Sequence, residues 1–252
     1  DLIETITGVL PEFHQIDLKE DTKVQQFFKQ NKVDGIIHFA AYKAVGESVE
    51  KPLMYYRNNI LGLLNVLDAM EAYAVDHFIF SSSCTVYGQA EKMPINELTP
   101  LKQPEAPYGN TKKMGEEIIN DFVKACKKQA IALRYFNPIG SHESSLLGEL
   151  PNGIPNNLLP YVTQTAMGIR EQLGVFGNDY DTRDGTAIRD YIDVNDLADA
   201  HVKAMQRLLN KKNKQSLEFF NLGSGTGSTV LEIVKAFEKA NNIKINYDIK
   251  PR

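Results

Sequence analysis

The sequence predicts an α/β protein built on a doubly wound parallel sheet. Two observations support this fold class. Apolar runs of strand length alternate with amphipathic helical patterns from one end of the chain to the other. The runs at 36–39 and 78–80 also lack the alternation of a half-exposed strand, as expected for strands that helices cover on both faces. A chain of 252 residues can hold one large domain or two small ones.

The individual elements follow from these patterns. Strands are predicted at 13–18, 35–40, 77–82, 130–137 and 217–222. Helices are predicted at 19–31, 50–73, 107–128, 193–209 and 229–240. From 138 to about 184 the pattern loosens into segments rich in Gly, Pro and Asn, which indicates a smaller lobe. We therefore expect a sheet domain at 1–137 and a smaller lobe at 138–252, part of which (about 187–222) returns to the sheet.

The composition is that of an ordinary globular protein, with 42% hydrophobic and 24% charged residues. A net charge of −4 gives no general affinity for nucleic acid or an anionic membrane, so neither is predicted as a partner. The sequence has no apolar run of about 18 residues and no apolar signal core. Cys84 and Cys126 are too few for a disulfide framework. We expect a cytoplasmic protein and predict no metal site.

A Tyr-x-x-x-Lys pair, Tyr108 and Lys112, lies at the start of a helix that Pro107 opens. Four residues span about 6 Å on one helix face, so the ammonium can lie near the phenol. A phenolate base requires the Tyr pKa to fall from about 10 to about 7, which costs about 4 kcal/mol. One positive charge at about 6 Å supplies about 2.8 kcal/mol, so we expect a second cation to contribute. The spacing alone is also compatible with an ordinary amphipathic Tyr and a solvated Lys.

Three serines, Ser81, Ser82 and Ser83, follow the apolar strand at 77–80 directly. In open α/β sheets, ligands and catalytic groups gather beyond the carboxyl ends of the strands. A hydroxyl at this position can hydrogen-bond the substrate oxygen that loses its proton to Tyr108. Without other indications, serines after a strand more often form turns or caps.

Longer segments in collinear order resemble the blocks of the UDP-galactose (UDP-glucose) 4-epimerases, in the extended short-chain dehydrogenase/reductase family. They are HFAAYKAVGES at 38–48, SSSCTVYG at 81–88, RYFNP at 134–138, GIPNNL at 153–158 and FGNDY at 176–180. The resemblance implies a Rossmann-type NAD-binding domain at 1–137 and a substrate-binding lobe at 138–252. The family's first strand and Gly-rich phosphate turn would precede residue 1, so we expect at least one βαβ unit to be missing from this chain.

The resemblance also implies an activity and its residues. Tightly bound NAD would take hydride from C4 of a UDP-hexose, and the 4-ketose would turn over before hydride returns to its opposite face. Tyr108 would be the general base and acid, Lys112 its electrostatic partner, and Ser83 the group that binds the reacting hydroxyl. Cofactor contacts are expected at Asp17, Leu18, Phe39, Ala40, Ala41, Lys43, Asn58, Ser81, Ser82, Tyr108, Lys112 and Phe136. Substrate contacts are expected at Ser83, Tyr108, Asn137, Asn157, Leu158, Phe176 and Arg189.

Two other functions compete with this interpretation. A sugar-nucleotide 4,6-dehydratase of the same family would need an Asp-Glu pair where this chain has Cys84 and Thr85. An inactive NAD-sensing homologue would not need Ser83, Tyr108 and Lys112. The resemblance further implies a homodimer formed through the helices at 50–73 and 107–128, and involvement in galactose metabolism. It leaves open whether UDP-N-acetylhexosamines are substrates and whether a mutarotase domain is fused to the chain.

Overall fold

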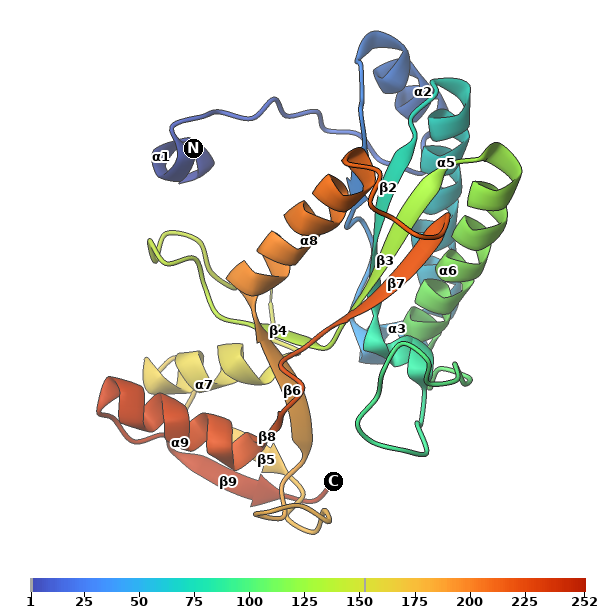
Figure 1. Cartoon of the computed structure of the whole chain (residues 1–252). Helices are drawn as coiled ribbons and strands as arrows, with labels where there is room; N and C mark the ends of the chain where they lie inside the picture. The colour runs from blue at the N-terminus through green and yellow to red at the C-terminus, as the bar shows by residue number, and fades with distance from the viewer. Residues whose placement is uncertain (1, 152) are drawn as a thin grey trace. The chain divides into compact units, whose positions relative to one another are not determined.

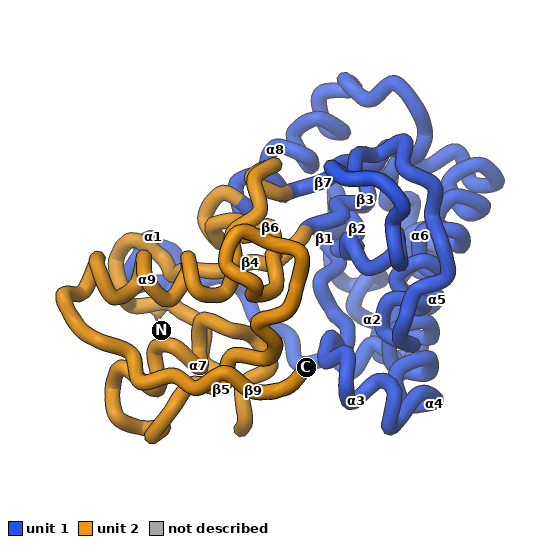
Figure 2. The backbone as a smooth tube through the Cα atoms, turned by 90° about the horizontal axis from the view of Figure 1, so that it is seen from below, with its two compact units in different colours: residues 1, 3–135, 197–222 blue, residues 2, 136–196, 223–252 orange. Residues whose placement is uncertain are grey.

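The computed structural model describes residues 2–151 and 153–252, which form two compact units (Figure 2). Apart from the first two residues, the first unit comprises 3–135 and 197–222, and the second comprises 136–196 and 223–252. The chain thus returns to the first unit at residue 197, later than the predicted return at about 187. The reason is that residues 188–193 form a strand of the second unit.

The first unit contains a four-stranded parallel sheet in the order β1-β2-β3-β7. Its strands are β1 (Ile36–His38), β2 (His77–Ser83), β3 (Gln129–Tyr135) and β7 (Leu217–Leu222). Helices α5 (Gly62–Ala72) and α6 (Pro107–Cys126) cover one face, and α8 (Val194–Leu209) covers the other (Figure 1). The predicted doubly wound parallel sheet is therefore confirmed.

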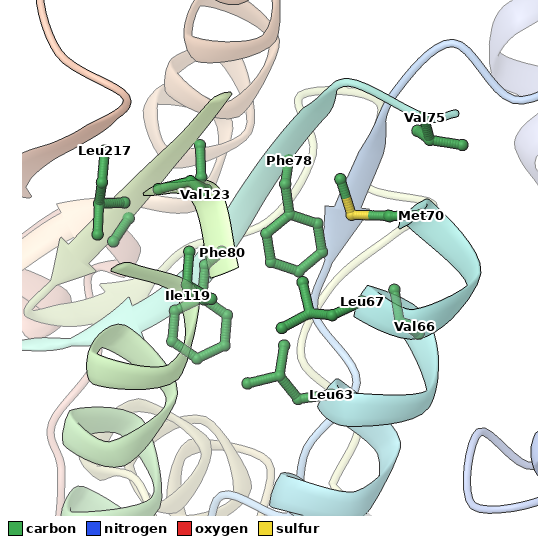
Figure 3. Close-up of a cluster of buried hydrophobic side chains, with 12 residues drawn as sticks. Leu63, Val66, Leu67, Met70, Val75, Phe78, Phe80, Ile119, Val123 and Leu217 are labelled. Atoms are coloured by element: carbon green, nitrogen blue, oxygen red, sulfur yellow. The ribbon is translucent and has the colours of Figure 1, made fainter. Parts of the chain in front are cut away.

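Side-chain alternation along β2 explains how both faces of the sheet are buried. Phe78 and Phe80 project to one face, where they pack with residues of α5 and α6 such as Leu67 and Ile119. Figure 3 shows the Phe78 ring pointing toward Leu67 and Met70 of α5. Ile79 projects to the other face and packs in a second cluster against α8.

The helix predicted at 50–73 differs from the structure, and α1 (Leu2–Thr7) and α7 (Leu158–Ala166) were not predicted. The segment predicted as one helix at 50–73 begins earlier and is interrupted: α3 (Val45–Glu50), α4 (Pro52–Tyr56), a π-helical turn (Arg57–Leu61) and α5 follow one another. Pro52 separates α3 from α4, because proline suits the first turn of a helix but not its interior. The remaining helical elements of this unit are α1 (Leu2–Thr7), α2 (Asp21–Gln30) and a 3-10 turn η2 (Cys84–Tyr87).

The strand predicted at 13–18 is wrong, because residues 13–18 contain no strand in the structure. A strand needs a neighbour for its backbone N–H and C=O groups, and no described strand pairs with this segment. Phe13 is 82% exposed, so the apolar residues that suggested a buried strand do not all reach the core.

The second unit is built on two small sheets. One has the order β4-β6-β8, from Asn137–Ile139, Ile188–Asp193 and Gly227–Thr229. The other pairs β5 (Leu173–Phe176) with β9 (Tyr247–Lys250) in parallel. Helices α7 (Leu158–Ala166) and α9 (Val230–Asn241) pack with β5 through a buried cluster that includes Val162, Val175 and Val234. Thr229 caps α9 through a reciprocal capping box with Glu232. Among the described helices, none combines the length and the apolar content needed to cross a bilayer.

Candidate active site at the carboxyl ends of the parallel strands

The start of α6 holds the proposed acid–base pair against the end of β2. Pro107 occupies the first turn of α6, where its fixed φ is favourable and its missing N–H costs nothing. Two turns further on, Gly115 allows close approach to β2, because a Cβ at this residue would lie 2.7 Å from Cζ of Phe80. The helix therefore lies close enough to the sheet for its first turns to reach the serines at the end of β2.

Tyr108 is half-buried on the first turn of α6 and hydrogen-bonds with Ser83. Burial raises the pKa of Tyr108 to about 12, although the hydrogen bond with Ser83 acts in the opposite direction. The phenol is therefore protonated at neutral pH in this environment. This agrees with the sequence-based estimate that Lys112 alone cannot produce a phenolate.

Lys112 is almost fully buried, with 4% of its surface exposed. Its Nζ donates a hydrogen bond of 2.6 Å to the carbonyl oxygen of Ser81 and lies 5.1 Å from the centroid of the Phe80 ring. Burial lowers the pKa of Lys112 to about 8. The ammonium is thus fixed to β2, the strand that also carries Ser83.

The three serines after the apolar part of β2 do different things, because successive strand residues face opposite sides of the sheet. Ser81 hydrogen-bonds through its hydroxyl with the hydroxyl of Tyr135, on the α8 side. Ser83 Oγ accepts hydrogen bonds from the backbone N–H and the hydroxyl of Thr85. Ser82 is fully buried, and its Oγ donates to Oε1 of Glu116 on α6. The Ser82 side chain is therefore committed to the protein interior, so the cofactor contact expected for this residue could come only from its backbone and stays a prediction.

The loop after β1 carries the next group of predicted cofactor contacts. Phe39 is 56% exposed, and its ring lies 4.6 Å from that of His201 on α8. Ala40 and Lys43 are exposed, and Ala41 is half-buried. These residues present an accessible apolar surface at the carboxyl end of β1, where a cofactor ring could lie.

Asn59 shapes this loop and was not predicted. Its side chain bonds both the N–H and the C=O of Tyr42, at 2.8 and 3.0 Å, and donates to Oγ1 of Thr111. Thr111 in turn donates to the backbone carbonyl of Tyr108. Asn59 thus joins the loop after β1 to the first turn of α6. The π-helical turn in which it lies is a signal of the kind that often marks functional sites.

The other predicted cofactor residues of the first unit are Asn58, Asp17 and Leu18. Asn58 donates to Oδ1 of Asn59 and is half-buried. Asp17 is exposed, pairs with Lys19, and lies in the turn before α2. Leu18 packs against the main core, and its carbonyl accepts a hydrogen bond from Asn65. No contact of these residues with Tyr108 or Lys112 is seen, so their roles remain predictions.

The second unit contains the predicted residues from Phe136 onward. Phe136 is half-buried, and Asn137 Nδ2 donates to the carbonyl oxygen of Asp190. Arg189, on β6, is exposed and donates to its neighbour's carbonyl oxygen. Phe176 is 63% exposed at the end of β5. These four side chains present accessible or polar groups. The side chain of Leu158 does not.

Two predicted substrate residues lie at the start of α7. Asn157 is exposed at the N-cap position and donates to Oε1 of Glu149. Leu158 packs its side chain into the core of the second unit, so only its backbone remains available to a ligand.

The residues around Tyr108 fit a nicotinamide dinucleotide. An oxidising cofactor for a carbinol needs an apolar surface for its rings and donors for its ribose hydroxyls. Phe39 supplies accessible aromatic surface, and Lys112 uses one of its three N–H donors on Ser81. No carboxylate is among the causes of the pKa shifts of Tyr108 and Lys112. Among residues 2–151 and 153–252, no cluster of His, Cys, Asp and Glu suits a metal ion.

Comparisons with known proteins identify the family of this chain. A model of the NAD dependent epimerase/dehydratase family matches residues 2–223. UDP-glucose 4-epimerase from Haemophilus influenzae is 50% identical over 251 residues, which are 99% of this chain and 73% of that protein. The Bos taurus protein of the same name is 48% identical over 99% of this chain and 71% of its own length.

Solved structures give the same result. The UDP-glucose 4-epimerase from Bifidobacterium longum, in complex with NAD+ and UDP, has a TM-score of 0.92 and 46% identity, over 99% of this chain and 74% of that one. The enzyme from Stenotrophomonas maltophila, with bound NAD and formylated UDP-arabinopyranose, has a TM-score of 0.94 and 41% identity over the same shares. This chain therefore belongs to the NAD dependent epimerase/dehydratase family, among its UDP-glucose 4-epimerases.

Proposed function

We propose that this protein interconverts UDP-galactose and UDP-glucose by transient oxidation at C4 of the hexose with tightly bound NAD. The observation that carries the proposal is the convergence of Tyr108, Lys112 and Ser83 at the end of β2, in a chain whose relatives at about 50% identity are UDP-glucose 4-epimerases. The physiological setting that we propose is galactose metabolism in the cytoplasm.

Tyr108 moves the proton of the reacting hydroxyl. With its pKa at about 12, forming the phenolate at pH 7 costs about 7 kcal/mol. Lys112 already belongs to the environment that sets this pKa, so the remaining cost must be offset by a further positive charge. NAD, when bound, supplies a reversible two-electron oxidant for the carbinol carbon and a positive charge on its oxidised ring. Tyr108 therefore becomes a competent base only when Lys112 and the oxidised cofactor act on it together.

Ser83 and Lys112 orient the reacting groups. The Ser83 hydroxyl accepts from Thr85 and bonds with Tyr108, so its oxygen is fixed next to the phenol. A substrate hydroxyl between Ser83 and Tyr108 would have an acceptor for its proton and a partner for its oxygen. Lys112 retains N–H donors for the cofactor ribose while it is held by Ser81.

Epimerisation requires that proton transfer be reversible and that the sugar turn while its nucleotide stays bound. Tyr108, once protonated, is the acid that returns the proton at O4. We assign the hold on the UDP group to Asn137, Asn157, Phe176 and Arg189 of the second unit. Arg189 is exposed and carries the positive charge that a diphosphate requires.

The test follows the hydrogen at C4. The protein with NAD is incubated with UDP-galactose deuterated at C4, in ordinary water, and the product is analysed by mass spectrometry and NMR. We expect UDP-glucose that retains the deuterium at C4, because the same cofactor removes and returns it. Loss of the deuterium to solvent, or a 4-keto-6-deoxy product typical of a dehydratase, would refute the proposal.

We also propose that the protein is a homodimer through the helices at 50–73 and 107–128. Leu53, Leu61 and Leu64 are 65%, 42% and 39% exposed, at helical spacing along α4, the π-helical turn and α5. Val45 and Val49 of α3 are also exposed. A helix face with this much accessible apolar surface is suited to burial against a second copy.

A further inference from the structure

A buried ion pair joins α6 to the centre of the sheet. Arg134 on β3 donates from Nε to Oε1 of Glu116 at 2.8 Å and from Nη2 to Oε2 at 2.6 Å. The two side chains are only 4% and 3% exposed. The guanidinium also lies 4.3 Å from the centroid of the Phe219 ring. This is a bidentate pair in the interior of the first unit.

The pair is the centre of a wider network. Ser82, Arg134 and Asn221 occupy one row across β2, β3 and β7, because the register pairs Ser82 with Arg134 and Arg134 with Asn221. Ser82 donates to Glu116 at 2.6 Å. Tyr87, in the turn after β2, accepts from Nη1 of Arg134 at 3.0 Å and donates to Oδ1 of Asn221 at 2.7 Å.

Each end of this network lies beside a group of the proposed active site. Glu116 is one helical turn after Lys112 on α6. Ser82 lies between Ser81, whose carbonyl binds the Lys112 ammonium, and Ser83, which bonds with Tyr108. The network therefore joins the two elements whose separation sets the distances among the three proposed catalytic groups.

A contribution to stability does not by itself explain why a buried ion pair is present at this place. Replacing a buried ion pair with apolar side chains of similar size is often neutral or stabilising. The same face of β2 already carries Phe78 and Phe80, which pack with apolar residues of α5 and α6. An apolar pair would extend that cluster, but it would not fix direction as a bidentate Arg–carboxylate contact does.

We propose that Glu116 and Arg134 are positioning residues: with Ser82 and Tyr87, they lock α6 to β2 so that Tyr108 and Lys112 meet Ser83 in the reactive geometry. This inference rests on the proposed epimerase function. The pair acts through other residues, since its own atoms are engaged with one another inside the protein.

The test replaces the pair with apolar residues, Glu116→Leu/Arg134→Met, and assays conversion of UDP-galactose with NAD. We expect kcat to fall about 10- to 100-fold, because small misplacements of reacting groups are costly. We expect KM for UDP-galactose to stay within about twofold and the thermal midpoint to be maintained or raised. The matched control is Arg207→Met/Glu218→Leu, which removes another bidentate helix–strand pair of the same unit. Its kcat should stay within about twofold of the wild type.

Two single substitutions at Ser82 test the same network with a smaller change to the core, in case the double variant does not fold. Ser82→Ala removes the hydroxyl that bonds Glu116 and should lower kcat several-fold, whereas Ser82→Thr keeps a hydroxyl and should restore most of the loss. NAD content, measured spectrophotometrically, should be equal in both variants. Loss of NAD in Ser82→Ala, or equal activity of Ser82→Ala and the wild type, would contradict the positioning role.

A measurement that does not depend on catalytic turnover can test this inference separately from the proposed function. The titration of Lys112 is followed by NMR of 13C-labelled lysine side chains. In Glu116→Leu/Arg134→Met we expect the Lys112 pKa to move from about 8 toward its ordinary value near 10.5, because an α6 that has shifted along the sheet no longer holds the ammonium in its buried position at the Ser81 carbonyl. If the wild-type protein had no epimerase activity, the proposed function would be refuted. The titration of Lys112 would still show whether the pair positions α6. An unchanged Lys112 titration with wild-type kcat would overturn it.

Discussion

Replacing Lys112 with Met should make the protein more stable and less active at neutral pH. Burial lowers the pKa of Lys112 from 10.5 to about 8, so keeping the folded side chain charged at pH 7 costs about 3 kcal/mol. Methionine removes this cost but leaves the Ser81 carbonyl without its donor, a loss of about 1–3 kcal/mol. The net expectation is a variant up to about 2 kcal/mol more stable at pH 7.

The pH dependence identifies the cause. Between pH 8 and 10.5 the unfolded chain holds a proton on this lysine that the folded chain has released. The free energy of unfolding of the wild type therefore rises with pH across this window, and the cost of the charge disappears. In Lys112→Met this contribution is absent, so its stability advantage should stay nearly constant up to about pH 8 and shrink as the pH rises from 8 to 9.5. Tyr108, whose folded pKa is about 12, begins to contribute only above about pH 10.

Activity should change in the opposite direction. A positive charge at about 6 Å from the phenol is worth about 2.8 kcal/mol, so its removal lowers the phenolate fraction about 100-fold. We expect kcat to fall by about that factor at pH 7 and to recover about tenfold per pH unit toward higher pH, as the phenolate fraction rises.

The assay is urea unfolding at pH 7, 8, 9 and 9.5, with epimerase kinetics on the same preparations. Lys113→Met is the matched control, because Lys113 is the adjacent, half-buried lysine of α6. A stability difference between wild type and Lys112→Met that stays constant from pH 7 to 9.5 would refute the reasoning.

Two further predictions concern assembly and packing. Leu61→Glu should shift sedimentation toward a monomer at micromolar concentration, because it places a charge in the proposed dimer face. Leu98→Glu, a control at a 92% exposed loop residue, should leave sedimentation unchanged. A dimer that persists in Leu61→Glu would exclude this face. Gly115→Ala should lower the free energy of unfolding by about 1–3 kcal/mol, because its Cβ would lie 2.7 Å from the Phe80 ring. Gly46→Ala, where no atom lies within 4 Å of the added Cβ, is the control, and an equal effect of both substitutions would contradict this packing argument.

Elements with a strong local pattern could be predicted from the sequence. The strand at 217–222 has the predicted bounds, and α6 begins at Pro107 as expected. The segment 13–18 has a comparable apolar content, but strand formation depends on a partner that lies elsewhere in the fold. Local composition cannot supply that information, so the prediction failed there.

The candidate site, too, could be predicted only in part from the sequence. The placement of Tyr108, Lys112 and Ser83 could be predicted, because helix and strand periodicities bring them to one edge of the sheet. The same alternation along β2, applied strictly, would have placed Ser82 on the opposite side from Ser81 and Ser83. Roles assigned by resemblance alone did not make that distinction.

The Arg134–Glu116 pair was also missed, although the sequence contains a signal for it. Arg134 follows the apolar run 130–133 in its strand, where a buried charged side chain requires a partner. Glu116 is four residues after Lys112, on the same face of α6. Which acidic residue would meet Arg134 depended on the packing of α6 against β3, which no local pattern determines.

The central claim is that the Tyr108 phenol is the acid and base at C4. Its most direct test compares the wild type and Tyr108→Phe, each with NAD bound, for conversion of UDP-galactose to UDP-glucose. Phenylalanine keeps the ring but cannot carry the proton, so kcat should fall by about 10²- to 10⁴-fold while NAD content is unchanged. Conversion by Tyr108→Phe at the wild-type rate would contradict the account.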